Sequence, residues 1–127
     1  MSKPLILVVE DEKDIRELIA FTLQFGGFRV VQAANGEEAV KMALTVEPDL
    51  ILMDVRMPKM DGYEACQTLK QNEKTKDIPV VFLSAKGREA EIKRGYEVGA
   101  EAYFLKPFTP EDLPPRLNRI LAKYGKL

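Results

Sequence analysis

The chain has 127 residues, enough for one domain with its own core, and 46% of them are hydrophobic and 31% charged, an ordinary balance for a soluble protein. Its net charge of −1 gives no basic excess for nucleic-acid binding. The absence of histidine excludes Ser-His-Asp and Cys-His catalysis, and the single cysteine, Cys66, excludes an internal disulfide. We interpret Cys66 as a small apolar residue on a helix rather than a reactive thiol.

Five short apolar runs predict the strands of one domain. They lie at 5–9, 28–33, 49–53, 78–84 and 102–105. The first and third runs are almost wholly apolar, which is typical of parallel strands covered on both faces. With right-handed crossovers, the pattern predicts a doubly wound α/β sheet. We expect a single domain over residues 1–127, with no output domain.

The first interval between strands has the periodicity of a helix. It begins near Ile15 and ends at Gly26-Gly27. We expect its apolar face to include Leu18, Ile19, Thr22 and Leu23. The first apolar run of the chain is too short to span a membrane and has no cleavage-site pattern, so we expect a cytoplasmic protein without a membrane segment.

The later intervals predict four more helices. Three of them are expected between Gly36 and Pro48, at 62–71, and at 88–98. The last one carries Leu113, Leu117, Ile120 and Leu121, but Pro114 and Pro115 lie near its start, and a proline inside a helix costs about 3 kcal/mol or more. Either a short turn at 110–113 precedes a helix starting near Pro114, or the first turn is distorted. We favour prolines that are tolerated near the helix start.

Reactive side chains follow four of the five predicted strands. The strands exit into Glu10-Asp11, Asp54, Ser84 and Lys106-Pro107, whereas the second exits into Ala33-Ala34. Ligands of doubly wound sheets bind at these carboxyl ends. Each residue also has an ordinary alternative taken alone: Asp11 as a helix cap, Ser84 in a turn, Lys106 as a solvated lysine, and Asp54 in capping or turn chemistry.

Taken together, these residues favour phosphoryl transfer. Three acids at one sheet edge repel one another unless a cation enters, and oxygen ligands without histidine or thiolate point to Mg²⁺. Lys106 supplies a fixed positive charge and Ser84 a hydroxyl for a tetrahedral anion. Asp54 is then the nucleophile that forms an aspartyl phosphate. Because this chain has no histidine, any phosphohistidine that donated the phosphoryl group would have to belong to another protein.

Four segments carry a resemblance to a known family. "VVEDE" (8–12), "LILMDVRMPKMDG" (50–62), "VVFLSAKG" (80–87) and "AYFLKPF" (102–108) resemble the receiver domain of two-component response regulators, in order and over nearly the whole chain. The resemblance implies a flavodoxin-like fold with five helices and five parallel strands in the order 2-1-3-4-5. It also implies a phospho-acceptor signalling switch that catalyses only its own phosphoryl transfer and dephosphorylation.

The resemblance assigns a role to each residue of the acidic site. Asp54 would take the phosphoryl group from a histidine kinase or phosphotransfer protein. Asp11 and Asp54 would ligate Mg²⁺ together with the backbone carbonyl of Arg56, and Glu10 would act through water. Lys106 would pair with the phosphoryl group, across a cis bond to Pro107. Glu10 stands where aspartate is commoner in the family. Its longer side chain can place the carboxylate differently relative to the metal.

The resemblance also implies a conformational response. Ser84, in place of the commoner threonine, would hydrogen-bond the phosphoryl oxygen. Tyr103 would turn inward as the fourth helix and fifth strand shift, changing the surface formed by helix 4, strand 5 and helix 5. Arg56 and Lys86 stand two residues past Asp54 and Ser84. We hypothesise that they shield the acyl phosphate and slow its hydrolysis; the alternative is that both point to solvent.

The expected partners are a phosphoryl-donor protein and a downstream protein target, with no direct contact to nucleic acid or membrane. A homodimer is possible through the surface of helix 4, strand 5 and helix 5, although a distorted last helix would alter that geometry. Three other functions are weighed. An aspartate-nucleophile phosphatase would carry an acid where Arg56 stands, a flavin-binding protein would need a phosphate-binding loop where "EDEKD" stands, and a phosphorylation-independent scaffold would not need Asp11, Asp54 and Lys106.

Overall fold

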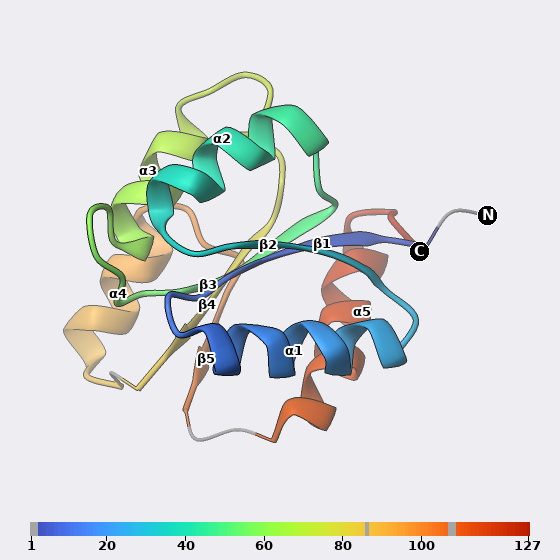
Figure 1. Cartoon of the computed structure of the whole chain (residues 1–127). Coiled ribbons are helices and arrows are strands. Elements are labelled where there is room, and N and C mark those ends of the chain that lie inside the picture. The colour runs from blue at the N-terminus through green and yellow to red at the C-terminus, as the bar shows by residue number, and fades with distance from the viewer. Residues whose placement is uncertain (1–2, 86, 107–108) are drawn as a thin grey trace.

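The five apolar runs form one parallel β-sheet in the computed structural model, which describes residues 3–85, 87–106 and 109–127 (Figure 1). The strands are β1 (Leu5–Val9), β2 (Arg29–Ala33), β3 (Leu50–Asp54), β4 (Val80–Ser84) and β5 (Ala102–Leu105). Their order is β2-β1-β3-β4-β5, and every adjacent pair is parallel. The predicted doubly wound α/β sheet with strand order 2-1-3-4-5 is confirmed.

Within these ranges, five α-helices cover the two faces of the sheet. They are α1 (Lys13–Phe25), α2 (Gly36–Val46), α3 (Gly62–Lys70), α4 (Glu89–Glu97) and α5 (Leu113–Lys123). Figure 1 shows α2, α3 and α4 on one side of the strands and α1 and α5 on the other. No helix among the described residues has the length and apolar character needed to cross a membrane.

The central strand β3 is buried along its whole length. Its side chains alternate between the two cores: Leu50 and Leu52 pack with the apolar residues of α1 and α5, and Ile51 and Met53 with those of α2 and α3. Each fully buried aliphatic side chain contributes roughly 1.5–3 kcal/mol. The strand that ends at Asp54 is therefore held from both sides, which fixes the position of that carboxylate.

The buried side of α1 differs from the prediction at one residue. Ile19 and Leu23 are in the core as expected, but Leu18 is 54% exposed, so its placement on the buried face is wrong. Each helical residue turns by about 100°, and the buried side is centred near Leu23. Leu18, five positions earlier, therefore points away from the sheet, on the same outer side as the exposed Phe21 and Phe25.

The last helix begins as the favoured alternative predicted. A short 3₁₀ turn, Pro110–Asp112, precedes α5, so Pro114 and Pro115 are its second and third residues. The first N–H groups of a helix have no partner within the helix, so a proline there removes no hydrogen bond. The first turn is compatible with both prolines, and the interior-proline penalty does not apply.

Candidate functional site

The carboxyl ends of β1 and β3 bring three acids together. Glu10 and Asp11 follow β1 directly and Asp54 ends β3, so carboxylate oxygens of all three lie within 4.8 Å of one another. Glu10 and Asp54 are buried and Asp11 is exposed. The alternative that Asp11 caps the next helix does not hold, because α1 begins at Lys13 with Glu12 at the cap position.

Lys106 lies against this acidic cluster. Its Nζ is 3.3 Å from Asp54 Oδ2 and 3.5 Å from Glu10 Oε1. The backbone N–H of Lys106 donates to the carbonyl of Ser84 at 2.8 Å, which extends the β4–β5 ladder to the lysine. The alternative of an ordinary solvated lysine is therefore wrong: the side chain spans the end of the sheet between β5 and the two buried acids.

The second oxygen of Asp54 faces the loop that follows β3. The backbone N–H of Arg56 donates to Asp54 Oδ1 at 3.2 Å. The loop is closed by Gly62, whose N–H donates to the carbonyl of Val55 at 2.8 Å. A Cβ at position 62 would lie 2.6 Å from the Asp54 carbonyl oxygen, so the loop requires glycine there.

The charges of the cluster shift two pKa values. Burial, followed by a hydrogen bond with Asp11 and repulsion from Asp54, raises the pKa of Glu10 to about 7. Burial by itself would lower the pKa of Lys106, but the Asp54 and Glu10 carboxylates more than offset it and raise that pKa. The Lys106 ammonium thus contacts two of the three clustered carboxyl groups, Asp54 and Glu10. The three together are a hard-oxygen set whose remaining repulsion a divalent cation would relieve.

Ser84 is the last residue of β4 and is buried beside the acids. It lines a cavity of about 490 Å³ together with Asp54, Lys106, Arg56 and Asp11. The position is set by the sheet, since β3 and β5 pair with β4 on either side. The alternative of an ordinary turn residue is wrong, because Ser84 belongs to strand β4. Ser84 therefore lies at the same edge of the sheet as the acidic cluster.

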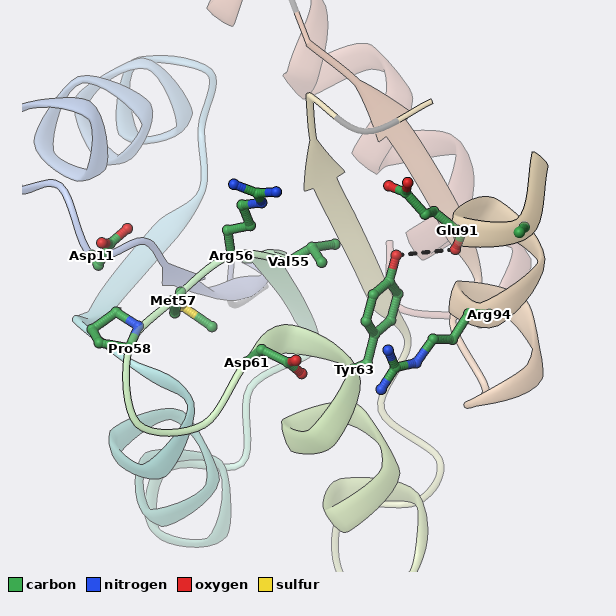
Figure 2. Close-up of a pocket in the computed structure, with 10 residues that line it drawn as sticks. Asp11, Val55, Arg56, Met57, Pro58, Asp61, Tyr63, Glu91 and Arg94 are labelled. Atoms are coloured by element: carbon green, nitrogen blue, oxygen red, sulfur yellow. Dashed lines mark hydrogen bonds between the residues drawn. The ribbon is translucent and has the colours of Figure 1, made fainter. Parts of the chain in front are cut away.

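A larger hollow adjoins the first. It has a volume of about 710 Å³, and Asp11 and Arg56 line both cavities. Figure 2 shows Tyr63 rising from α3 towards α4, where Glu91 and Arg94 form the opposite wall. The Arg94 guanidinium lies 4.5 Å from the centre of the Tyr63 ring, a cation–π contact.

Tyr103 reaches this wall from β5. Its hydroxyl lies 3.2 Å from the hydroxyl of Tyr63, and both rings make edge contacts with Phe82. Tyr63 was not predicted from the sequence, since nothing in the chain pattern pairs it with a tyrosine 40 residues away. The sole signal is its place directly after the loop glycine, Gly62.

Two predicted positions lie outside the described residues. They are Lys86, proposed to influence phosphoryl lifetime, and Pro107, proposed to follow a cis bond. Cys66 matches its interpretation as a structural residue: it is buried, its thiol donates to the Val98 carbonyl at 3.4 Å, and burial raises its pKa to about 11.

Comparison with known proteins finds one family over most of the chain. The family model for the response regulator receiver domain matches residues 6–118. The phosphate regulon transcriptional regulatory protein PhoB of Pseudomonas aeruginosa is 42% identical over 120 residues, 94% of this chain and 52% of that protein. The alkaline phosphatase synthesis transcriptional regulatory protein PhoP of Bacillus subtilis is 42% identical over 118 residues, 93% of this chain and 48% of that protein. The chain thus spans about half the length of these relatives.

Solved structures agree with the family model. The chemotaxis response regulator CheY4 of Vibrio cholerae has a TM-score of 0.88 at 34% identity, covering 94% of this chain and 99% of that one. The receiver domain of the sensor histidine kinase PA1611 of Pseudomonas aeruginosa PAO1 has a TM-score of 0.82 at 32% identity, covering 97% and 98%. That structure has a magnesium ion coordinated in its active-site cleft.

Proposed function

The chain belongs to the family of response regulator receiver domains, and we propose that Asp54 is the residue that accepts the phosphoryl group. Receiver domains of two-component systems are phospho-acceptor switches rather than metabolic enzymes. The observation that supports Asp54 most strongly is its contact with Lys106. The ammonium group, 52 residues away in sequence, lies 3.3 Å from Asp54 Oδ2 at the end of a fully buried strand.

The acidic cluster fits a magnesium ion. Three carboxyl groups with the Lys106 ammonium retain net repulsion, and their hard oxygens suit Mg²⁺. We assign Asp11, Asp54 and the backbone carbonyl of Arg56 to the metal, with Glu10 acting through water. When bound, the ion would neutralise charge that develops on the phosphoryl oxygens. The longer arm of Glu10 already reaches Lys106, at 3.5 Å, so its carboxylate also positions the lysine.

The proposed transfer needs few parts. A carboxylate oxygen of Asp54 attacks the phosphorus of a phosphohistidine on a partner protein. The new O–P bond forms as the P–N bond breaks, and the electron pair of that bond stays on the imidazole nitrogen. Lys106 and the Ser84 hydroxyl stabilise charge on the transferred group, and water attack on the acyl phosphate later restores Asp54.

The switch would follow from the new charge at Asp54. Ser84 would move to hydrogen-bond the phosphoryl oxygen, and phosphorylation would favour the arrangement in which Tyr103 lies inward against Phe82, as it does in this structure, while α4 and β5 adjust. The surface formed by α4, β5 and α5 would then change for a downstream protein. Kinases of the two-component class interact with this family. We propose that such a kinase or a phosphotransfer protein is the donor, that the chain acts in the cytoplasm on a downstream protein target, and that the surface of α4, β5 and α5 can form a homodimer.

The whole protein's activity is a separate proposal. The relatives PhoB and PhoP are transcriptional regulators by name, and this chain spans about half of each. The absence of a basic excess argues against direct nucleic-acid contact by the receiver domain itself. We therefore propose that this domain acts through protein–protein contact.

Intact-mass spectrometry tests whether Asp54 accepts a phosphoryl group. The protein is incubated with Mg²⁺ and acetyl phosphate, and the intact mass of the wild type is compared with that of Asp54→Asn. We expect one phosphoryl adduct on the wild type, none after chelation with EDTA, and none on the variant. No adduct on the wild type would rule out the switch, and an adduct on Asp54→Asn would move the site to another residue.

A further inference from the structure

The Tyr63 hydroxyl joins three elements of the fold. It belongs to α3, donates to the Glu91 carbonyl in α4 at 3.0 Å, and lies 3.2 Å from the Tyr103 hydroxyl of β5. A phenol has one proton to donate. Since that proton goes to Glu91, Tyr103 must donate to the Tyr63 oxygen. The two bonds form a directed chain from β5 through α3 to α4.

The Tyr63 end of this chain of hydrogen bonds is buried, and the Tyr103 end is half-buried. Tyr63 is 5% exposed, and burial, ahead of its contact with Tyr103, raises its pKa well above the ordinary value. The hydroxyl therefore stays neutral and keeps its proton. A hydrogen bond of this kind makes a modest net contribution to the stability of the arrangement that contains it. Removing the Tyr63 oxygen would leave the Tyr103 hydroxyl without this acceptor.

The Tyr103 ring packs where Gly95 of α4 has no side chain. A Cβ at Gly95 would lie 2.7 Å from Cδ2 of the Tyr103 ring and 3.3 Å from Phe82. The interior position of the Tyr103 ring, against Phe82, thus depends on the missing side chain at position 95. In this position the Tyr103 hydroxyl reaches the Tyr63 hydroxyl, which accepts its proton.

Helix α4 is held against the rest of the fold partly by its contacts with Tyr63. Within the described part of α4, Gly95 is the one buried residue. Tyr63 contacts α4 at two places: its hydroxyl donates to the Glu91 carbonyl, and the Arg94 guanidinium is stacked on its ring. A change in the position of Tyr103 would therefore reach α4 through Tyr63.

We propose that Tyr63 is a positioning residue of the switch, whose hydroxyl holds Tyr103 in the interior position and couples it to α4. The proposal rests on the proposed function, in which Tyr103 takes that interior position when Asp54 carries the phosphoryl group. By linkage, a group that stabilises the activated arrangement also tightens binding of a phosphoryl mimic at Asp54. Tyr63→Phe keeps the ring and removes that contribution.

The test is the affinity for beryllofluoride, a phosphoryl mimic, measured with Mg²⁺ by amide chemical shifts. We expect Tyr63→Phe, which removes the hydrogen bonds to both Glu91 and Tyr103, to bind about five-fold more weakly than the wild type, about the net effect of one hydrogen bond. Tyr103→Phe should weaken binding similarly. The double variant should be no weaker than the weaker single variant, because both remove the same bond.

A matched control separates this role from general loss of stability. Tyr124 also donates a hydrogen bond, to Glu101 Oε2 at 2.9 Å, but at the opposite end of β5 from Asp54. Tyr124→Phe should leave the beryllofluoride affinity unchanged, even where both variants lower the urea midpoint equally. Should Tyr63→Phe not fold, Gly95→Ala gives the same test, since its methyl group displaces the Tyr103 ring and should also weaken binding.

The outcomes separate the two proposals. If the wild type fails to bind beryllofluoride, or Asp54→Asn binds it equally well, the assignment of the phosphoryl site fails. If the wild type binds and Asp54→Asn does not, but Tyr63→Phe matches or exceeds the wild-type affinity, the role of Tyr63 is refuted while the phosphoryl site stands. Equal weakening by Tyr124→Phe would also refute it.

Discussion

Arg56 contributes to the site through two different groups. Its backbone N–H donates to Asp54 Oδ1, so the main chain at this position helps to fix the carboxylate. Its side chain is exposed and lines both cavities beside the acidic cluster. A substitution that keeps the backbone therefore tests the guanidinium alone.

We predict that Arg56→Ala shortens the lifetime of the aspartyl phosphate. An exposed charge pair contributes at most about 1 kcal/mol, which corresponds to roughly two- to five-fold faster hydrolysis. Lys86→Ala should act in the same direction. The measurement is the loss of the phosphoryl adduct with time, by intact mass, after the donor is removed.

The control is Arg119→Ala, which removes an exposed arginine from α5 instead. Its dephosphorylation rate should equal that of the wild type. Unchanged rates in both Arg56→Ala and Lys86→Ala would end the shielding hypothesis and leave both side chains as solvated cations.

At the scale of elements, the start of α5 packs directly against the end of α1. Gly26 caps α1 with an ordinary φ of −78°, so glycine is not needed there for its backbone freedom. A Cβ at this position would instead lie 2.9 Å from Cγ of Pro114. A proline ring cannot rotate away, so the two helices approach as closely as they do because residue 26 has no side chain.

We predict that Gly26→Ala lowers the free energy of unfolding by about 1–3 kcal/mol, the usual cost of overpacking. Pro114→Ala should recover most of that loss in the double variant, as measured by urea unfolding. Pro115→Ala, at the neighbouring exposed proline, should not. Equal recovery by both prolines would show that the loss comes from the α1 end itself and not from the contact between helices.

The elements were predictable from sequence because their signals are local. The observed strands agree with the apolar runs to within two residues at each end, since glycine, proline and polar turns bound each run. The side of α1 that is buried was not fully predictable. Leu18 and Ile19 are adjacent and equally apolar, and only packing against the sheet decides that Ile19 is buried and Leu18 exposed.

The residues of the site also fall into those that the sequence predicts and those that it does not. Asp11, Asp54, Ser84 and Lys106 could be predicted because each ends or follows a strand, and a parallel sheet gathers its strand ends at one edge. The Tyr63–Tyr103 contact could not. It depends on side-chain directions from a helix and a strand, and on the space above Gly95, none of which a linear pattern encodes.

At the scale of the whole molecule, the two sides of the site are held differently. Asp54 ends a strand that is buried throughout, while α4 contributes one buried residue within the described structure. Proteins move most readily where few apolar groups are buried. We therefore expect binding at Asp54 to stabilise the molecule as a whole while changing the position of α4 more than that of β3.

We predict that Mg²⁺ with beryllofluoride raises the unfolding free energy of the wild type. A ligand at 100 times its Kd stabilises the folded state by about 2.7 kcal/mol, because it binds that state and not the unfolded chain. The increase should vanish with EDTA and in Asp54→Asn, as followed by thermal unfolding. An equal increase in Asp54→Asn would mean that the ligand binds elsewhere.

The tyrosine pair between α3 and β5 also has an optical consequence. The chain contains four tyrosines and no tryptophan, so when light that phenylalanine does not absorb is used for excitation, its emission comes from phenol rings. Tyr63 and Tyr103 are two of these four, and they share a hydrogen bond next to Phe82 and Arg94. Phenol emission responds to hydrogen bonding and to nearby charge. The unlabelled protein thus carries its own fluorescent reporter at the joint between β5 and α4.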